Sequence, residues 1–257
     1  MAKTTRSSER SSQRRVDALT RERIVEAAID LLDSQGEGGL TFRALAARLE
    51  TGHGAIQWHI ANKNDLLQAA ADAVISSAVT GVADGVTPPE RIRGIALAVF
   101  DAIDAHPWVG TELSREPWQP AVLRIFEGVG GQLHALGVPQ GARFDAASTL
   151  LNFILGLAGQ YAAGARLIGH ATDRQAFLAD LAARWSDLDP ARYPFAHQVA
   201  PQLRDHDDRE QFLAGVDLIL AGMTAPGYPG GGVPCPIRPA EGTTKTPDAS
   251  AVNTPSA

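Results

Sequence analysis

A short stretch between Thr41 and Lys63 carries side chains that could hold phosphate groups. Thr41 and Lys63 each fall at the amino end of an expected helix, where free backbone N–H groups and the helix dipole favour an anion. A cation in the first turn is unfavourable for the helix itself, so we expect Lys63 to meet an anion. Thr41 could also serve as a helix cap, and the two roles are compatible.

Four expected helices position these side chains. The first follows the N-cap Thr20 and ends at the glycines of residues 36–39, the second is capped by Thr41, the third runs from about His53 to His59, and Asn62 caps the fourth. Apolar residues at helical spacing predict one buried face for each. The inward residues are Ile24, Ala27, Ala28, Leu31 and Leu32, then Phe42, Leu45, Ala46 and Leu49, then Ala55, Ile56 and Ile60, and finally Leu66, Leu67, Ala70 and Val74.

The second and third helices are joined by a tight turn that contains Gly52. Such a pair suits a helix-turn-helix, in which the second helix enters the major groove of DNA and the first braces it. Arg43 and Arg48 then point outward. A small three-helix bundle without any DNA-binding function would show the same periodicity, so periodicity alone leaves both interpretations open.

Longer motifs favour the DNA-binding interpretation. Residues 24–28 are IVEAA, residues 39–46 are GLTFRALA and residues 54–67 are GAIQWHIANKNDLL. In order and spacing, the stretch from Arg23 to Leu67 resembles the DNA-binding domain of the TetR family of bacterial transcriptional regulators. It departs from the family at Gln57, where a tyrosine that touches a phosphate is usual. Gln57 could donate to phosphate, pair with adenine through its amide, or remain a solvated polar residue.

The resemblance implies a set of DNA contacts around the third helix. His59 has an alternative, because an isolated histidine is more often buried with its ring bonded to the backbone. The implied DNA-binding residues are Thr51, His53, Gly54, Ala55 and Gln57 at the bases, Trp58 and His59 near the sugar-phosphate backbone, Thr41 and Lys63 at flanking phosphates, and the outward-pointing Arg43.

The composition divides the chain into four parts. Residues 1–18 are rich in serine and arginine and are expected to form a disordered basic arm. Residues 19–66 form the helix-turn-helix domain, 67–225 a larger helical domain, and 226–257 a disordered tail rich in glycine and proline. Seven basic residues face three acidic ones before Ile24. The arginines Arg14, Arg15, Arg21 and Arg23 could follow phosphates or enter the minor groove, or the arm could be solvated and without function.

Helical periodicity continues beyond Pro88, so we predict an all-α protein. Prolines between Ser186 and Asp208 predict a loop there, with at most short turns. The expected helices run from Pro88 to His106, Pro107 to Leu113, Pro120 to Leu136, Gly141 to Ile168, Arg174 to Trp185 and Arg209 to Ala221. The long fourth helix of this series, Gly141 to Ile168, is apolar nearly all round, which predicts burial on all sides.

The family resemblance implies a homodimer and a small-molecule effector. In TetR-like proteins two late helices pair across a two-fold axis, and the long helix and the last helix suit that role, although either could pack within one subunit. Large aromatic residues with a few polar neighbours suit a mostly apolar pocket, although each could be plain core. The candidate effector-binding residues are His106, Trp108, Glu112, Trp118, Phe126, His134, Asn152, Phe153, Gln160 and Tyr161.

Bulk properties exclude several other classes. The formal charge of −6 argues against indiscriminate coating of nucleic acid, and a single cysteine, Cys235, offers neither a disulfide framework nor a cysteine metal cluster. We expect a cytoplasmic protein without membrane association, since no apolar run approaches the roughly 20 residues of a membrane span. No catalytic or metal motif is evident, so we expect neither an enzyme nor a cofactor. The alternatives are a DNA-binding regulator controlled by a protein partner and an all-helical enzyme.

Overall fold

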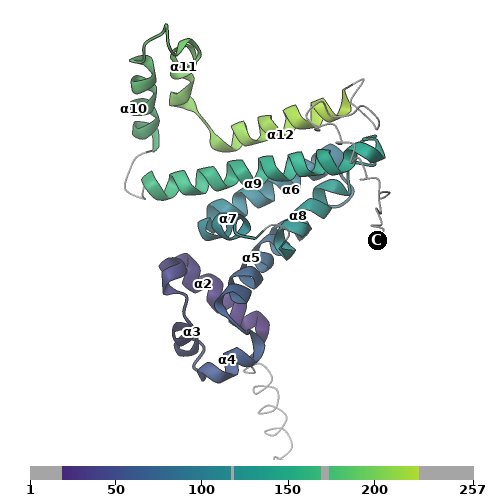
Figure 1. Cartoon of the computed structure of the whole chain (residues 1–257), viewed down its shortest axis with the longest axis vertical. Coiled ribbons are helices and arrows are strands. Elements are labelled where there is room, and N and C mark those ends of the chain that lie inside the picture. The colour runs from purple at the N-terminus through teal and green to yellow at the C-terminus, as the bar shows by residue number, and fades with distance from the viewer. Residues whose placement is uncertain (1–18, 117–118, 169–173, 226–257) are drawn as a thin grey trace, which may run out of the picture.

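The computed structural model describes residues 19–116, 119–168 and 174–225, and all regular secondary structure in these residues is helical. Figure 1 shows a small group of helices, α2 to α4, joined through α5 to a larger helical body. The predicted all-α fold is confirmed. The predicted arm (1–18) and tail (226–257) lie outside the described residues.

The small group consists of α2 (Arg21–Gly39), α3 (Phe42–Arg48), α4 (His53–His59) and the start of α5 (Lys63–Thr80). All three predicted side-chain caps are present. The hydroxyl of Thr20 accepts from the N–H of Arg23 at 3.3 Å, that of Thr41 from Ala44 at 3.1 Å, and the Asn62 amide oxygen from Asp65 at 2.9 Å. These caps fix where the helices begin, because each satisfies a backbone donor that has no partner within the helix.

The turn between α3 and α4 differs from the expected glycine turn. Its left-handed residue is Glu50, with φ of 50°, whereas Gly52 has an extended backbone and is the N-cap of α4. The N–H of Thr51 donates to the carbonyl of Ala46 at 3.0 Å and that of Glu50 to Ala47 at 3.4 Å. This bonding is that of a Schellman motif, which satisfies the last carbonyls of α3 and reverses the chain within a few residues.

The larger body contains nine further elements. Figure 1 shows α9 and α12 running alongside one another, with α6, α7 and α8 beneath them and with α10 and α11 standing away from the body. The elements are α6 (Pro88–Ala105), α7 (Pro107–Leu113), α8 (Pro120–Gly130), the 3₁₀ turn η1 (Gln140–Ala142), α9 (Arg143–Ile168), α10 (Arg174–Ser186), α11 (Pro194–Val199), the 3₁₀ segment η2 (Ala200–Asp205) and α12 (Asp208–Thr224).

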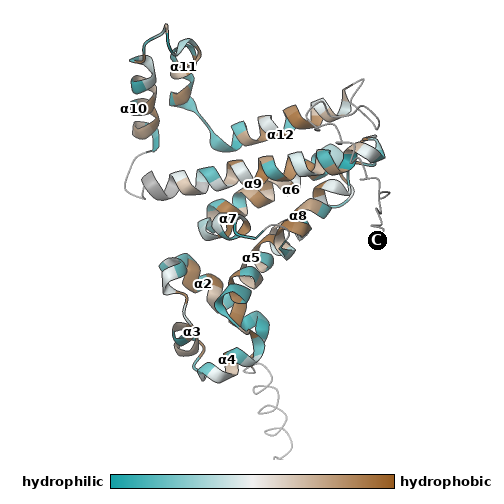
Figure 2. Ribbon diagram, viewed as in Figure 1, coloured by the Kyte–Doolittle hydropathy of each residue, from teal (hydrophilic) through white to brown (hydrophobic). Residues whose placement is uncertain are grey.

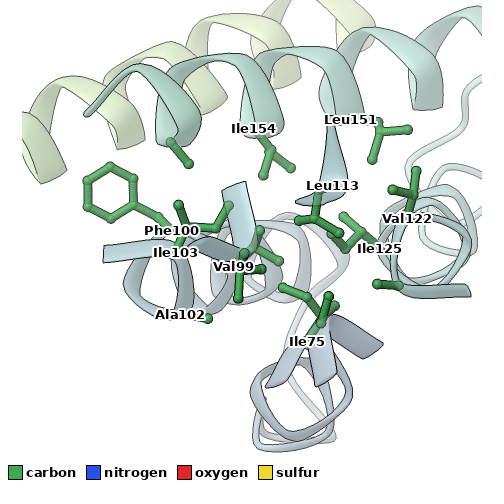
Figure 3. Close-up of a cluster of buried hydrophobic side chains, with 14 of the residues drawn as sticks. Ile75, Val99, Phe100, Ala102, Ile103, Leu113, Val122, Ile125, Leu151 and Ile154 are labelled. Atoms are coloured by element: carbon green, nitrogen blue, oxygen red, sulfur yellow. The ribbon is translucent and has the colours of Figure 1, made fainter. Parts of the chain in front are cut away.

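The hydrophobic core of the body joins five helices. Ile75 of α5, Val99 of α6, Leu113 of α7, Ile125 of α8 and Ile154 of α9 meet there (Figure 3), and each is less than a twentieth exposed. The core is continuous with that of the small helical group. Continuous packing of this kind fixes α5 against both parts, so that α5 positions one part relative to the other.

Two predicted stretches differ from the structure. The helix expected to reach Leu136 ends at Gly130, and tighter turns lead to Gly137, whose φ of 78° needs a glycine. The loop expected between Ser186 and Asp208 contains α11 and η2. Pro194 and Pro201 lie in the first turns of these two segments, where a proline costs no helical hydrogen bond, so they start short helices rather than prevent them.

The long helix α9 is not buried on all sides in the single chain. One face, which includes Leu150 and Ile154, is buried, whereas Asn152, Gly156 and Gln160 on the opposite face are exposed. Both hydrophilic and hydrophobic residues occur along its length (Figure 2). The neighbouring helices α6, α7, α8 and α12 cover only part of its circumference, which leaves the other face free.

Candidate nucleic-acid interface and its junction with the helical body

Helix α4 buries its apolar side chains and presents its polar ones to solvent. Ile56 and Ile60 anchor it in the core, while His53 and Gln57 are exposed and Trp58 is 88% exposed. The exposed indole of Trp58 therefore offers an apolar contact surface beside the polar side chains of the same helix. Ala55, predicted as inward-facing, is instead exposed beside Gly54.

Histidines bracket the exposed surface of α4. The ring of His53 packs edge-on against that of Phe42 in α3, with centroids 5.4 Å apart. This contact holds the first residue of α4 against the bracing helix. His59 is exposed, so the alternative of a buried histidine is wrong. Arg43 is also exposed, and Thr51 is half-buried in the turn.

The two flanking helix ends differ from each other in their surroundings. Thr41 is an exposed N-cap of α3, free to offer its hydroxyl to a further partner. Lys63 is partly buried, and its ammonium donates to the backbone carbonyl of Glu37 at 2.7 Å and lies 4.0 Å from the Glu37 carboxylate. Lys63 therefore has a hydrogen-bond partner within the protein, the Glu37 carbonyl, while the Glu37 carboxylate lies at the limit of ion-pair distance.

Charged side chains of α2 also join the small helical group to α6 and α7. The Asp33 carboxylate accepts from the His106 ring at 2.8 Å and from the Trp108 indole at 2.7 Å. The Glu37 carboxylate accepts from Arg115, just after α7. The hydrogen bond from Arg115 is the main reason that the pKa of Glu37 lies below its usual value. Asp33, Glu37 and Arg115 were not predicted from the sequence, because their partners are 73 to 78 residues away along the chain.

A cavity of about 310 Å³ lies at this junction. Asp33 and Glu37 of α2, Leu67 of α5, and Trp108 and Thr111 of α7 are among its lining residues. A second cavity, of about 280 Å³, lies in the body between α7, α8 and α9. It is lined by Leu113, Ser114, Val122, Ser148, Leu151, Asn152 and Leu155.

Comparison with known proteins identifies the family. The family model described as "Bacterial regulatory proteins, tetR family" matches residues 24–70, and that of the "Tetracyclin repressor-like, C-terminal domain" matches residues 85–226. The chain belongs to the TetR family. The first match contains α4 and both flanking helix ends, so it covers the exposed surface described above.

Individual relatives support the TetR assignment along most of the chain. An HTH-type transcriptional regulator of Saccharopolyspora erythraea is 29% identical over 208 residues, which are 80% of this chain and 85% of the relative. The class D tetracycline repressor of Escherichia coli is 27% identical over 216 residues, 80% of this chain and 89% of the repressor.

Solved TetR structures share the fold. The transcriptional regulator SCO7222 of Streptomyces coelicolor is 52% identical, with a TM-score of 0.74 over 80% of this chain and 98% of that protein. ActR of the same organism, solved in complex with actinorhodin, is 24% identical, with a TM-score of 0.65 over 80% of this chain and 95% of ActR. The ActR likeness shows the fold alone.

The candidate effector-binding residues of this TetR protein are spread over several places. Trp108 lines the junction cavity and His106 bonds beside it, whereas Asn152 lines the second cavity. Phe153 stacks on Phe212 of α12 at 5.7 Å, and Tyr161 packs against Phe100 and donates to Gln211. The others are Phe126 against Phe144, His134 bonded to Arg143 at 2.8 Å, the exposed Gln160, and Trp118, which lies outside the described residues.

Glu112 is the most unusual of these candidates. Its side chain is 2% exposed, and burial raises the pKa of its carboxyl above the usual value. One carboxylate oxygen accepts from Arg115 at 3.1 Å, while the other has no hydrogen-bond partner among the described residues, and the same is true of the amide oxygen of the buried Gln119. Two orphaned acceptors near the end of α7 leave this segment less firmly bonded than its surroundings.

The described residues hold neither a metal-binding cluster nor a membrane-spanning helix. No group of three or more metal-binding side chains occurs among them. None of their helices has the length and apolar character needed to cross a membrane.

Proposed function

We propose that this TetR-family protein is a repressor that binds operator DNA as a homodimer through α4 and leaves it when a small, largely hydrophobic molecule binds the larger helical domain. The observation that carries the proposal is the surface of α4. His53, Gln57 and Trp58 project into solvent from a helix anchored by Ile56, and Lys63 and Thr41 lie at the helix ends on either side. Side chains from an anchored helix suit base contacts, and the flanking helix ends suit phosphates.

Two exposed helix faces support the homodimer. Small or polar residues, among them Asn152 and Gly156, cover the exposed face of α9, and Leu218 of α12 is 75% exposed between Ala214 and Ala221. A face of small residues around one exposed leucine allows close approach of the same face from a second copy. Two copies would present two α4 helices to half-sites about 34 Å apart, and a single small helix-turn-helix rarely binds strongly.

Effector control has support of a different kind. The two cavities are of a size that holds small organic molecules, and both have apolar walls with a few polar groups. ActR has been solved in complex with actinorhodin and with (S)-DNPA. We propose that the present protein likewise responds to a small organic molecule, and that such a molecule prefers one spacing of the two α4 helices.

Control by a protein partner is the second candidate. Phe195, 73% exposed, and Tyr193, 43% exposed, lie at the start of α11, which stands away from the body (Figure 1). Exposed aromatic residues on a projecting segment suit a protein contact. In this mode α4 would contact DNA in the same way, and the protein partner would replace the small molecule as the controlling factor.

Selection of bound DNA from a random pool tests the function. We expect an inverted repeat with half-sites about one helical turn apart. The selected operator is then titrated with hydrophobic metabolites and drugs, and release of the DNA identifies an effector. Enrichment of no sequence would contradict the regulator, and release only by a captured protein would favour the second candidate.

A further inference from the structure

We infer that Arg115 sets the affinity for DNA by holding the Glu37 carboxylate away from Lys63. The inference rests on the proposed function, because it takes Lys63 to be a phosphate contact. It assigns to Arg115 and Glu37, neither of which is among the predicted DNA-binding residues, the role of positioning residues for that contact.

The geometry forms a chain of alternating charges across the junction. One guanidinium nitrogen of Arg115 donates to the Glu112 carboxylate at 3.1 Å, and another donates to the Glu37 carboxylate. The Lys63 ammonium bonds the neutral backbone carbonyl of Glu37 at 2.7 Å, while the nearer Glu37 carboxylate oxygen is 4.0 Å away. Lys63 therefore has a hydrogen-bond partner, but the charge nearest to it is already paired with Arg115.

The Glu37 carboxylate can exchange Arg115 for Lys63 as its partner with little change in the free energy of folding. Arg115, Glu37 and Lys63 are each about two-fifths exposed, so solvent screens the individual ion pairs and each contributes little to stability. Loss of Arg115 would leave the Glu37 carboxylate without its strongest partner. Among the described residues the other cation that pairs with this carboxylate is the Lys63 ammonium, 4.0 Å away, which a short rotation of the Glu37 side chain would bring into hydrogen-bond distance. A Lys63 ammonium paired with a carboxylate is a weaker partner for phosphate, because the phosphate must then compete with that carboxylate.

The same series of charged side chains extends to the proposed effector region. Arg115 lies two residues after the end of α7, and Glu37 lines the junction cavity together with Trp108 and Thr111 of α7. A displacement of the end of α7 would move Arg115 relative to Glu37. Occupancy of the cavity could therefore alter the charge presented to DNA without any change in α4 itself.

The experiment measures affinity for the selected operator by fluorescence anisotropy over a salt series, with full-length protein. Arg115→Met keeps the length of the side chain and removes its charge. We expect it to weaken binding about fivefold at low salt and to reduce the steepness of the salt dependence. Glu37→Gln in the same chain should restore both values, and Glu37→Gln alone should bind as tightly as the natural protein or about twofold more tightly.

A matched control uses Arg124→Ala. Arg124 is 41% exposed and pairs with Asp72 at 3.2 Å, so it also joins the body to α5, but no predicted phosphate contact lies beside it. Its operator affinity should stay within about twofold of the natural value. Melting temperatures show whether each variant folds, and if Arg115→Met does not fold, Glu37→Gln alone decides, since weaker binding by it overturns the inference.

The outcomes separate the inference from the function. Unchanged affinity of Arg115→Met, or a double variant that binds more weakly than either single one, would show that Arg115 has no such role, although the protein would still be a DNA-binding regulator. Failure of the natural protein to bind any selected DNA would instead remove the proposed function itself.

Discussion

At the scale of single residues, Glu112 combines burial with an ionisable group. Burial holds its pKa above the ordinary value of 4.5. At a pH between 4.5 and this raised pKa, the folded state therefore keeps a proton that the unfolded state releases. Stability is therefore greatest when Glu112 is protonated and falls as pH rises through its raised pKa. Glu112→Gln removes this titration, and we expect a melting temperature about 3 °C higher than that of the natural protein at neutral pH.

The gain from Glu112→Gln should disappear in acid. At a pH of about 4 both chains carry a neutral side chain at this position, so their melting temperatures should converge. The exposed Glu127→Gln is the control and should change neither value. A gain of the same size at both pH values would contradict burial of a charge as its cause.

Residue-scale features of the candidate site were partly predictable. The sequence predicts the N-caps Thr20, Thr41 and Asn62, because a cap is a local contact over three residues. The partner of Lys63 could not be predicted in this way. Glu37 is 26 residues earlier, and only the packing of α2 against α5 brings its carbonyl to the ammonium.

At the scale of helices, apolar periodicity predicted most elements because nearly every helix has one buried face. Periodicity says nothing of which neighbour covers a face, so α9 was expected to be buried all round. It also carries no signal for a left-handed residue such as Glu50, at which α3 ends. The bounds of α7 were predicted without error, since Pro107 marks its start and a turn follows Leu113.

The exposed faces of α9 and α12 make a prediction about assembly. Leu218→Glu places a charge at the centre of the proposed dimer face, where a second copy would bury it without a partner. We expect sedimentation velocity to show a monomer, and operator affinity to fall by about tenfold or more because one half-site contact is lost. Leu123→Glu, at a residue 52% exposed on α8, should leave the dimer intact. A dimeric Leu218→Glu variant would show that copies meet elsewhere.

At the scale of the whole molecule, the net charge is negative although the expected DNA contacts include cations. The chain carries a formal charge of −6, yet its expected DNA contacts include Arg43 and Lys63 in the small helical group. A net negative protein has weak attraction to DNA in general, so binding depends on a few positioned cations and on base contacts. Helix α5 and the Asp33 and Glu37 contacts of α2 join the small helical group to the body. We therefore expect a movement within the body to change the spacing of the two α4 helices in a dimer.

The most direct test of this account is the salt dependence of operator binding by the natural protein and by Lys63→Ala. If α4 lies in the major groove with Lys63 on a phosphate, Lys63→Ala should weaken binding equally for all operator sequences. The slope of log affinity against log salt should then fall by about one for each half-site. An unchanged slope, or a loss of affinity confined to particular base sequences, would contradict the placement of α4 and its flanking helix ends on DNA.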